Sequence, residues 1–261
     1  MPSIDANGVA LNYRFDGPAD APPVVMSNSL ASNLDMWDWQ MPALTDRYRV
    51  LRYDSRGHGG SAVPPGPYSI DLLVRDARAL MLALDIPRAH FVGLSKGGSV
   101  GQLLAVTHPE MVRSLVLCDT TSFAGGPAVW QPRIDAAAKG GMESVCAATL
   151  ERWFTPAFRK NSPAEVDKVR RMILTTPAAG FVACSEALRD MNQTALLKRI
   201  AAPTLIMVGK DDPGTPVAHS EILHREIPGS RLLVLEDAAH FANVEQAARF
   251  NAALRDFLDR H

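Results

Sequence analysis

The pentad Gly93-Leu94-Ser95-Lys96-Gly97 has the G-x-S-x-G spacing that places a nucleophilic serine on a sharp turn between a strand and a helix. The apolar run "HFVGLS" leads directly into "KGGSVGQLLA", so Ser95 stands where a strand is predicted to end and a helix to begin. Glycines on both sides permit the tight turn, and a helix N-terminus favours developing negative charge. Such pentads also arise by chance, and a purely structural turn is the alternative interpretation.

A serine hydroxyl becomes an effective nucleophile when a base takes its proton, and after such a turn the chain order is serine, acid, histidine. His240 is the best placed of the seven histidines, because it follows the apolar run "RLLVLED" and precedes the last predicted helix. Asp212 in "TLIMVGKDDPGTP" is the preferred acid, with Asp211 and Asp119 as alternatives. The acid would hold the imidazole in the correct tautomer and stabilise the imidazolium. A solvated loop is the alternative for His240.

Acyl transfer also requires donors for the oxyanion of the tetrahedral intermediate. The backbone N–H of Lys96, the residue after the nucleophile, is one predicted donor. The second is expected from the loop "SNSLASNLDMW", where the Leu30 N–H is the first choice and Ser29 the second.

Four side chains are candidates for binding the substrate. The ammonium group of Lys96 could attract an anionic substrate group; the alternative is that its stem lies on apolar surface while the head reaches water or pairs with an acid. Arg133 in "VWQPR" suits bidentate carboxylate binding, with a solvated helix arginine as the alternative. Trp130 and Trp153 could wall an apolar pocket or simply pack within their helices.

Short apolar runs alternate with amphipathic stretches, a pattern typical of a mostly parallel sheet covered by helices on both faces. The sequence predicts a hairpin turned at Asn7-Gly8, followed by six buried strands in "PPVVMSNS", "YRVLRYD", "AHFVGLS", "RSLVLCD", "PTLIMVG" and "SRLLVLED". Helices are expected at 35–45, 69–85, 97–107, 217–226 and 243–259.

The stretch 121–199 contains no convincing strand, and glycines and prolines break its helical pieces. The sequence therefore predicts an α/β core formed by 1–120 and 200–261, with a helical cap at 121–199 over the carboxyl ends of the strands. A separate domain is the alternative, which the return of the strand pattern at Pro203 disfavours.

The segments "GLSKGG", "RYDSRGHGGS", "VGKDD" and "AAHFANVE" together resemble the α/β-hydrolase superfamily and occur in that family's order. A narrower resemblance, to the 3-oxoadipate enol-lactonases of the β-ketoadipate branch of aromatic catabolism, shows in "MSNSLASNLDMW", "VLRYDSRGHGGSAVPPGPYSID", "VWQPR" and "ERWFTPAF". The resemblance implies an α/β-hydrolase fold with an eight-stranded, mostly parallel sheet, and lactone hydrolysis without a cofactor. It also implies a triad and an oxyanion hole formed by Ser95, Asp212, His240, Leu30 and Lys96.

Two positions depart from the family pattern. Asn28-Ser29 stands where many relatives carry His-Gly, although the lactonase subgroup is similar, and Lys96 replaces the usual apolar residue after the nucleophile. We therefore expect a serine hydrolase of a small carboxylic ester or lactone, with 3-oxoadipate enol-lactone or a close analogue as the implied substrate. The alternatives are a general carboxylesterase or another lactonase, and a non-catalytic small-ligand receptor on the same fold. A haloalkane dehalogenase is disfavoured, because it would carry aspartate at position 95.

Bulk composition limits the other functions. The net charge of −1 across 261 residues argues against nucleic acid as a partner. Three widely spaced cysteines favour a reducing compartment and disfavour a zinc site. The N-terminus shows no signal-peptide pattern, and no apolar run approaches the roughly 18 residues of a membrane span. These features predict a cytoplasmic protein that acts on a small molecule, without metal or membrane.

Overall fold

Eight strands form one sheet across residues 2–261 of the computed structural model, the part of the chain that the structure describes. Their order in the sheet is β1-β2-β4-β3-β5-β6-β7-β8. The strands are β1 (Ser3–Ala6), β2 (Val9–Asp16), β3 (Pro23–Ser27), β4 (Arg49–Tyr53), β5 (Ala89–Leu94), β6 (Val112–Cys118), β7 (Thr204–Gly209) and β8 (Arg231–Leu235). The predicted eight-stranded α/β fold is confirmed.

The N-terminal hairpin is the antiparallel part of this sheet. β1 pairs with β2, and β2 pairs with β4, in antiparallel register, whereas β3 to β8 pair in parallel. Asn7 and Gly8 have φ values of 60° and 70°, as the predicted type I′ turn requires. The central strands β5 and β7 are buried along their whole length, which explains their continuous apolar sequences.

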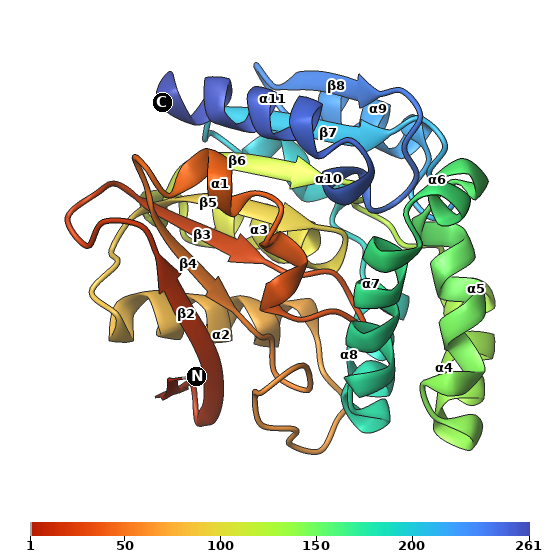
Figure 1. Cartoon of the computed structure of the whole chain (residues 1–261). Coiled ribbons are helices and arrows are strands. Elements are labelled where there is room, and N and C mark those ends of the chain that lie inside the picture. The colour runs from red at the N-terminus through yellow and green to blue at the C-terminus, as the bar shows by residue number, and fades with distance from the viewer. Residues whose placement is uncertain (1) are drawn as a thin grey trace.

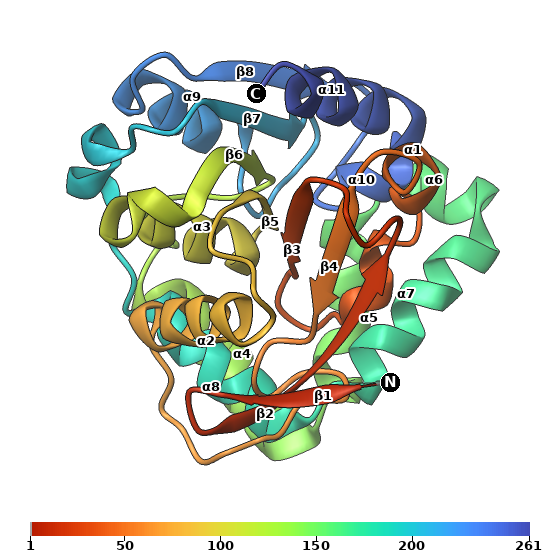
Figure 2. The same cartoon turned by 90° about the vertical axis from the view of Figure 1, so that its left-hand side faces the viewer.

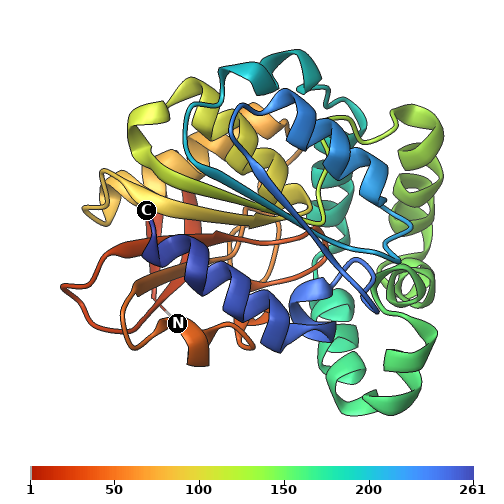
Figure 3. The same cartoon turned by 90° about the horizontal axis from the view of Figure 1, so that it is seen from above.

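Helices cover both faces of the sheet, as Figures 2 and 3 show. The helices α2, α3 and α9 lie on one face, and α1 and α11 lie on the other. Their bounds are α1 (Met41–Leu44), α2 (Ile70–Ala83), α3 (Lys96–Thr107), α9 (Val217–Glu226), α10 (Ala242–Glu245) and α11 (Ala247–Asp259). Short 3₁₀ helices are η1 (Leu34–Trp37), η2 (Pro109–Met111) and η3 (Thr194–Arg199).

Two predicted helices are interrupted. The stretch 35–45 forms η1 and α1 separately, because Pro42 in the first turn of α1 has no N–H to continue a preceding helix. The stretch 243–259 is divided between α10 and α11 at Gln246, whose backbone leaves the helical region at φ −118° and ψ 42°.

Five helices follow β6 and precede β7. They are α4 (Pro127–Gly140), α5 (Glu143–Trp153), α6 (Pro156–Asn161), α7 (Pro163–Thr175) and α8 (Ala178–Arg189). Figure 1 shows them together beside the end of the sheet to which the arrowheads of β6, β7 and β8 point. An isolated bridge joins Phe123 to Asn192 at the two ends of this segment. The exact division into core and cap at 121–199 stays a prediction.

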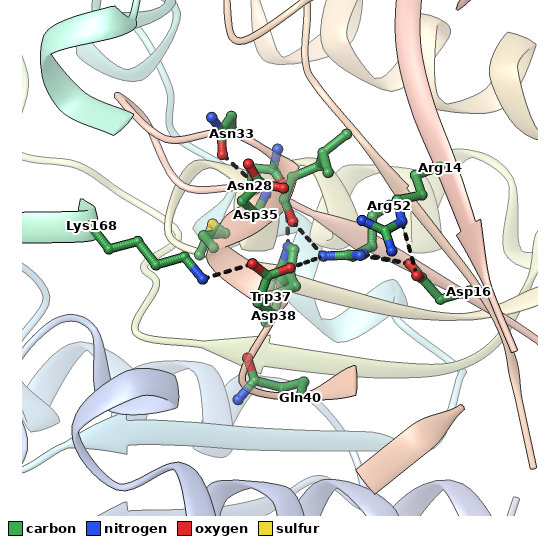
Figure 4. Close-up of polar contacts among 12 residues, drawn as sticks. Arg14, Asp16, Asn28, Asn33, Asp35, Trp37, Asp38, Gln40, Arg52 and Lys168 are labelled. Carbon is green, nitrogen blue, oxygen red and sulfur yellow. Dashed lines mark hydrogen bonds and ion pairs between the residues drawn. The ribbon is translucent and has the colours of Figure 1, made fainter. Parts of the chain in front are cut away.

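A chain of charged side chains joins this helical segment to the sheet (Figure 4). Lys168 of α7 donates to Asp38 at 2.7 Å and lies 4.3 Å from the centre of the Trp39 ring. Arg52 of β4 donates to the other oxygen of Asp38 at 2.6 Å and pairs with Asp16 at 2.7 Å. The side chain of Arg52 is 1% exposed, so its charge is balanced by carboxylates on both sides. Within the described residues, no helix combines the length and hydropathy needed to cross a membrane.

Candidate active site

Ser95 occupies the turn between β5 and α3, where it is the N-cap residue of the helix. Its φ of 55° and ψ of −115° lie outside the regions that L-residues usually adopt. The turn is possible because glycines flank it: a Cβ on Gly93 would lie 2.2 Å from the Gly97 carbonyl oxygen, and one on Gly97 would lie 2.0 Å from the Ser27 carbonyl oxygen. The strained backbone therefore presents the serine at the end of a buried parallel strand.

His240 and Asp212 form a close pair on the loops that follow β8 and β7. The distance between His240 Nδ1 and Asp212 Oδ2 is 2.7 Å, and Thr215 Oγ1 donates to the same oxygen at 2.5 Å. The backbone N–H of Gly214 donates to Asp212 Oδ1 at 2.7 Å. Burial alone would raise the pKa of Asp212, but the His240 charge and these hydrogen bonds outweigh it and hold that pKa below its usual value. The carboxylate is thus ionised and oriented toward the imidazole.

Ser95 and His240 line the same pocket, together with residues of the oxyanion loop and of the cap helices. The His240 ring lies beside the Trp153 indole, with centroids 6.3 Å apart and planes at 30°. Trp153 in turn stacks on Phe241 at 4.0 Å. These aromatic contacts limit the rotation of the imidazole, which lines the pocket.

The two alternative acids occupy different environments. Asp211 is exposed. Asp119 is fully buried after β6, where its Oδ1 accepts from the Gly209 N–H at 2.8 Å and its Oδ2 has no partner among the described residues. Burial and the neighbouring Asp212 carboxylate raise the pKa of Asp119 well above its usual value. Asp119 lies away from His240 in this arrangement, and Asp212 is the carboxylate that the structure places against the imidazole.

The loop after β3 brings Ser29, Leu30 and Ala31 to the lining of the pocket. The Ser29 N–H donates to Met36 Sδ at 3.3 Å, and the Ala31 N–H donates to His58 Nε2 at 3.1 Å. Because its two neighbours are engaged, the Leu30 N–H is the candidate for the oxyanion role, and that assignment stays a prediction. The loop is anchored to the sheet by Asn28, which accepts from the Trp37 indole N–H at 2.9 Å and donates to the backbone of β4 at 2.8 Å.

The remaining walls of the pocket come from the cap helices. The predicted binding residues Trp130, Arg133 and Trp153 all line it. The Arg133 guanidinium lies 5.0 Å from the centre of the Trp130 ring. Sequence reasoning missed Arg152, which also lines the pocket and donates to Thr149 at 3.1 Å. Trp153, the next residue in "ERWF", was predicted from its aromatic ring. An arginine in an amphipathic helix gives no comparable indication, because the sequence does not distinguish an arginine that lines a pocket from one that faces solvent.

Two guanidinium groups therefore face the same cavity. Burial lowers the pKa of Arg133, and burial together with the charge of Arg133 lowers the pKa of Arg152 to about 10. Both remain cationic near neutral pH. Two partly buried guanidinium groups in one pocket favour the binding of an anion between them.

The structure places the Lys96 side chain neither in the active site nor at the surface, the two positions that the sequence suggested. The residue is 1% exposed and is absent from the lining of the pocket, so its ammonium group neither enters the site nor reaches water. Its Nζ has no hydrogen-bond partner anywhere in residues 2–261. Burial lowers the pKa of Lys96, while the charges of Cys184, Asp54 and Asp76 act in the opposite direction. What remains for the site is the backbone N–H of Lys96 at the start of α3.

Metal ligands are not gathered near this pocket. Within residues 2–261, no three or more His, Cys, Asp and Glu side chains are placed to hold a metal ion. Among the residues that line the cavity, Arg133 and Arg152 carry positive charge, and guanidinium groups bind anions. The arrangement can support acyl transfer, in which a serine oxygen attacks a carbonyl and an imidazole moves the proton.

Comparison with known proteins agrees with this geometry. Residues 22–247 match the family model described as the alpha/beta hydrolase fold. The chain is 40% identical over 258 residues to 3-oxoadipate enol-lactonase 2 of Acinetobacter baylyi, covering 99% of this chain and 96% of the relative. It is similar to the crystal structure of the enol-lactonase from Burkholderia xenovorans LB400, with a TM-score of 0.97, 38% identity and coverage of 99% and 100%. A thermophilic esterase from Thermogutta terrifontis, solved with malate bound, matches with a TM-score of 0.94, 28% identity and coverage of 100% and 99%. This similarity extends over the sheet, the cap helices and the loops between them. The chain therefore belongs to the α/β-hydrolase fold family.

Proposed function

We propose that this chain is a serine hydrolase that opens a small lactone or carboxylic ester, with 3-oxoadipate enol-lactone or a close analogue as its substrate. The observation that carries the proposal is the pocket that unites Ser95 with an imidazole held 2.7 Å from a buried carboxylate. The two enol-lactonase relatives, at 40% and 38% identity, support the choice of substrate.

In the proposed mechanism, His240 takes the proton of Ser95 as the serine oxygen attacks the lactone carbonyl. The Leu30 and Lys96 N–H groups hold the oxyanion of the tetrahedral intermediate. The ring C–O bond then breaks, and the leaving oxygen receives the proton from the imidazolium. Water, deprotonated by His240, hydrolyses the acyl-enzyme and restores Ser95.

The two arginines support an anionic substrate. In 3-oxoadipate enol-lactone a carboxymethyl group is attached to the carbon that bears the ring oxygen, so the carboxylate lies on the leaving side of the scissile bond. His240 must face that side, and it shares its pocket with Arg133 and Arg152. We therefore assign these guanidinium groups to the carboxylate, a role that the sequence had attributed in part to Lys96.

The test compares hydrolysis of the enol-lactone with that of a neutral lactone of the same ring size. Ser95→Ala should abolish turnover of both. Arg133→Gln and Arg152→Gln should each lower kcat/KM for the carboxylate-bearing lactone by about 10- to 100-fold, because a charge-assisted hydrogen bond contributes about 1.5–3 kcal/mol. Both variants should leave the neutral lactone nearly unchanged.

Two results would contradict the proposal. Turnover that persists in Ser95→Ala would remove the acyl-enzyme mechanism. Binding of lactones without turnover by the wild-type protein would instead support the non-catalytic receptor. Arg159→Gln, a partly exposed arginine on α6, serves as the matched control for loss of a positive charge.

A further inference from the structure

The segment "RGHGGS" after β4 carries a buried histidine that the proposed mechanism does not use. His58 is 0% exposed and is not among the residues that line the pocket. Its Nε2 accepts a hydrogen bond from the Ala31 N–H at 3.1 Å. Ala31 does line the pocket, next to Leu30, whose N–H is the proposed oxyanion donor. The imidazole therefore contacts the loop after β3 from outside the pocket.

The contacts of the ring fix which of its nitrogens carries the hydrogen. His58 Nδ1 lies 3.3 Å from the Arg56 carbonyl oxygen, which can only accept, so Nδ1 is the donor. A neutral imidazole then has its lone pair at Nε2, as the hydrogen bond from Ala31 requires. Burial and, after it, the charge of Lys96 lower the pKa of His58 well below its usual value, which keeps the ring neutral. Both ring contacts are therefore satisfied by the Nδ1–H tautomer alone.

His58 is itself held from two sides. Its backbone N–H donates to the Ser55 carbonyl at 3.0 Å within the turn after β4. Cap helix α8 packs against this turn so closely that a Cβ on Gly180 would lie 1.9 Å from the Gly57 carbonyl oxygen. Cys184 of the same helix has its Sγ 3.9 Å from His58 Nδ1. The imidazole is therefore enclosed between the turn and the helix, and it offers Nε2 as a fixed acceptor.

The loop after β3 needs such an acceptor because its backbone is strained. Ala31 has a φ of 57°, in the left-handed region that residues other than glycine rarely adopt. The peptide that carries the Leu30 N–H lies between the peptides that carry the Ser29 and Ala31 N–H groups. Met36 Sδ accepts from the first of these at 3.3 Å, and His58 accepts from the second. Without His58, the strained residue could relax and the Leu30 N–H could change direction.

We propose that His58 is a positioning residue for the oxyanion hole. By accepting from the Ala31 N–H, it holds the loop after β3 in the conformation that directs the Leu30 N–H toward the substrate oxygen. The inference rests on the proposed serine-hydrolase function. His58 does not line the pocket, so it acts on the reaction only through the loop, whereas His240 moves the proton.

The first measurement uses the wild-type protein and does not depend on turnover. Long-range proton–nitrogen NMR correlations on protein with isotope-labelled histidine report which ring nitrogen carries hydrogen. His58, assigned by the loss of its signals in His58→Gln, should show the Nδ1–H tautomer near neutral pH. The Ala31 amide should exchange slowly with solvent, and faster in His58→Leu. An Nε2–H tautomer or an imidazolium would overturn the inference, because neither can accept from Ala31.

The second measurement compares kcat and KM for one lactone or p-nitrophenyl ester. His58→Leu removes the acceptor and should lower kcat by about 10- to 100-fold with KM changed less than about threefold, because an oxyanion donor acts mainly in the transition state. His58→Gln places an amide oxygen near the position of Nε2 and should restore kcat to within about fivefold of wild type.

The matched control is His90→Leu, which removes another buried histidine. His90 on β5 hydrogen bonds to Ser114 of β6 at 2.7 Å and does not line the pocket. This variant should keep the kcat of the wild-type protein. All variants are compared as protein that remains folded by circular dichroism.

Failure of the inference is distinguishable from failure of the proposed function. If the wild-type protein is active and His58→Leu keeps its kcat, or if His58→Gln loses as much as His58→Leu, the inference falls and the hydrolase stands. If the wild-type protein turns over no lactone or ester, the proposed function falls. The tautomer of His58 and the exchange of the Ala31 amide then still decide whether the imidazole holds the loop.

Discussion

Replacing Lys96 with methionine is expected to stabilise the protein and to leave its substrate preference unchanged. The lysine side chain is 1% exposed, and its Nζ finds no partner in the described part of the chain. An unsatisfied buried donor costs about 1–3 kcal/mol, and more when it is charged. Methionine keeps most of the packing of the stem and removes the amine. We expect Lys96→Met to raise the free energy of unfolding by about 2 kcal/mol.

The gain should depend on pH in a direction that follows from linkage. Because the folded state lowers the pKa of Lys96 below 10.5, the unfolded chain binds more protons at this position between the folded pKa and 10.5. The destabilisation that Lys96 causes in the wild-type protein therefore decreases as pH rises from the folded-state pKa toward 10.5. The advantage of Lys96→Met should be greatest below the folded-state pKa and should shrink as pH rises toward 10.5.

The measurement is urea unfolding near pH 7 and near pH 9.5, with thermal melts as a second readout. For a chain of this size, about 2 kcal/mol corresponds to a rise in Tm of roughly 4–8 °C. Lys198→Met replaces an exposed lysine and should change stability by less than about 0.5 kcal/mol. kcat/KM should stay within about threefold for lactones with and without a carboxylate, because the backbone N–H at position 96 remains.

Two outcomes would refute this reasoning. Destabilisation by Lys96→Met at pH 7 would show that the amine makes a favourable interaction that outweighs its burial. A selective loss of activity toward carboxylate-bearing substrates would show that the ammonium group reaches the pocket after all.

Three further predictions concern the site and its supports. Asp212→Asn should lower kcat for ester hydrolysis by about 10⁴-fold, because the imidazole loses the partner that selects its tautomer; a loss below tenfold would argue for another acid. Asp76 accepts two hydrogen bonds at 2.5 Å from the guanidinium of Arg56, and both side chains are buried. Asp76→Asn should therefore lower the free energy of unfolding, measured in urea, by about 3–5 kcal/mol. A loss of less than about 1 kcal/mol would show that Arg56 finds another partner. Gly97→Ala forces a Cβ to 2.0 Å from the Ser27 carbonyl and should reduce kcat about 100-fold or more in protein that remains folded by circular dichroism; normal activity would mean that the turn has room to shift.

Periodicity predicted the strands well because both faces of a parallel sheet are buried. Runs such as "TLIMVG" leave few alternatives to a central strand, and the glycine spacing around Ser95 defines a turn that few other sequences can make. The stretch 35–45 was predicted as one helix, since its apolar spacing is the same whether or not Pro42 divides it. Local signals of this kind act over a few residues and can be recognised in the chain itself.

The position of charged side chains could not be predicted in the same way. Lys96 and Arg152 both lie on helices, where a long cationic side chain normally reaches water. Whether it does depends on what packs above it, and here the covering groups come from segments far apart in sequence. Burial and, after it, the charge of Lys96 lower the pKa of His58, and the charge of Lys96 also acts on Cys184 of α8, two residues from segments far from it in sequence.

The amino-acid sequence by itself determined the parallel sheet, the serine turn and the order of serine, acid and histidine, because each depends on residue types within a short stretch of chain. Only the tertiary structure decided which aspartate faces the imidazole, that two arginines share the pocket, and that the lysine after the nucleophile is buried away from it. The first outcome depends on how the loops after β7 and β8 meet, and the other two depend on the packing of α4, α5 and α8 with one another and over the site. Such packing is set by long-range contacts that no local pattern records.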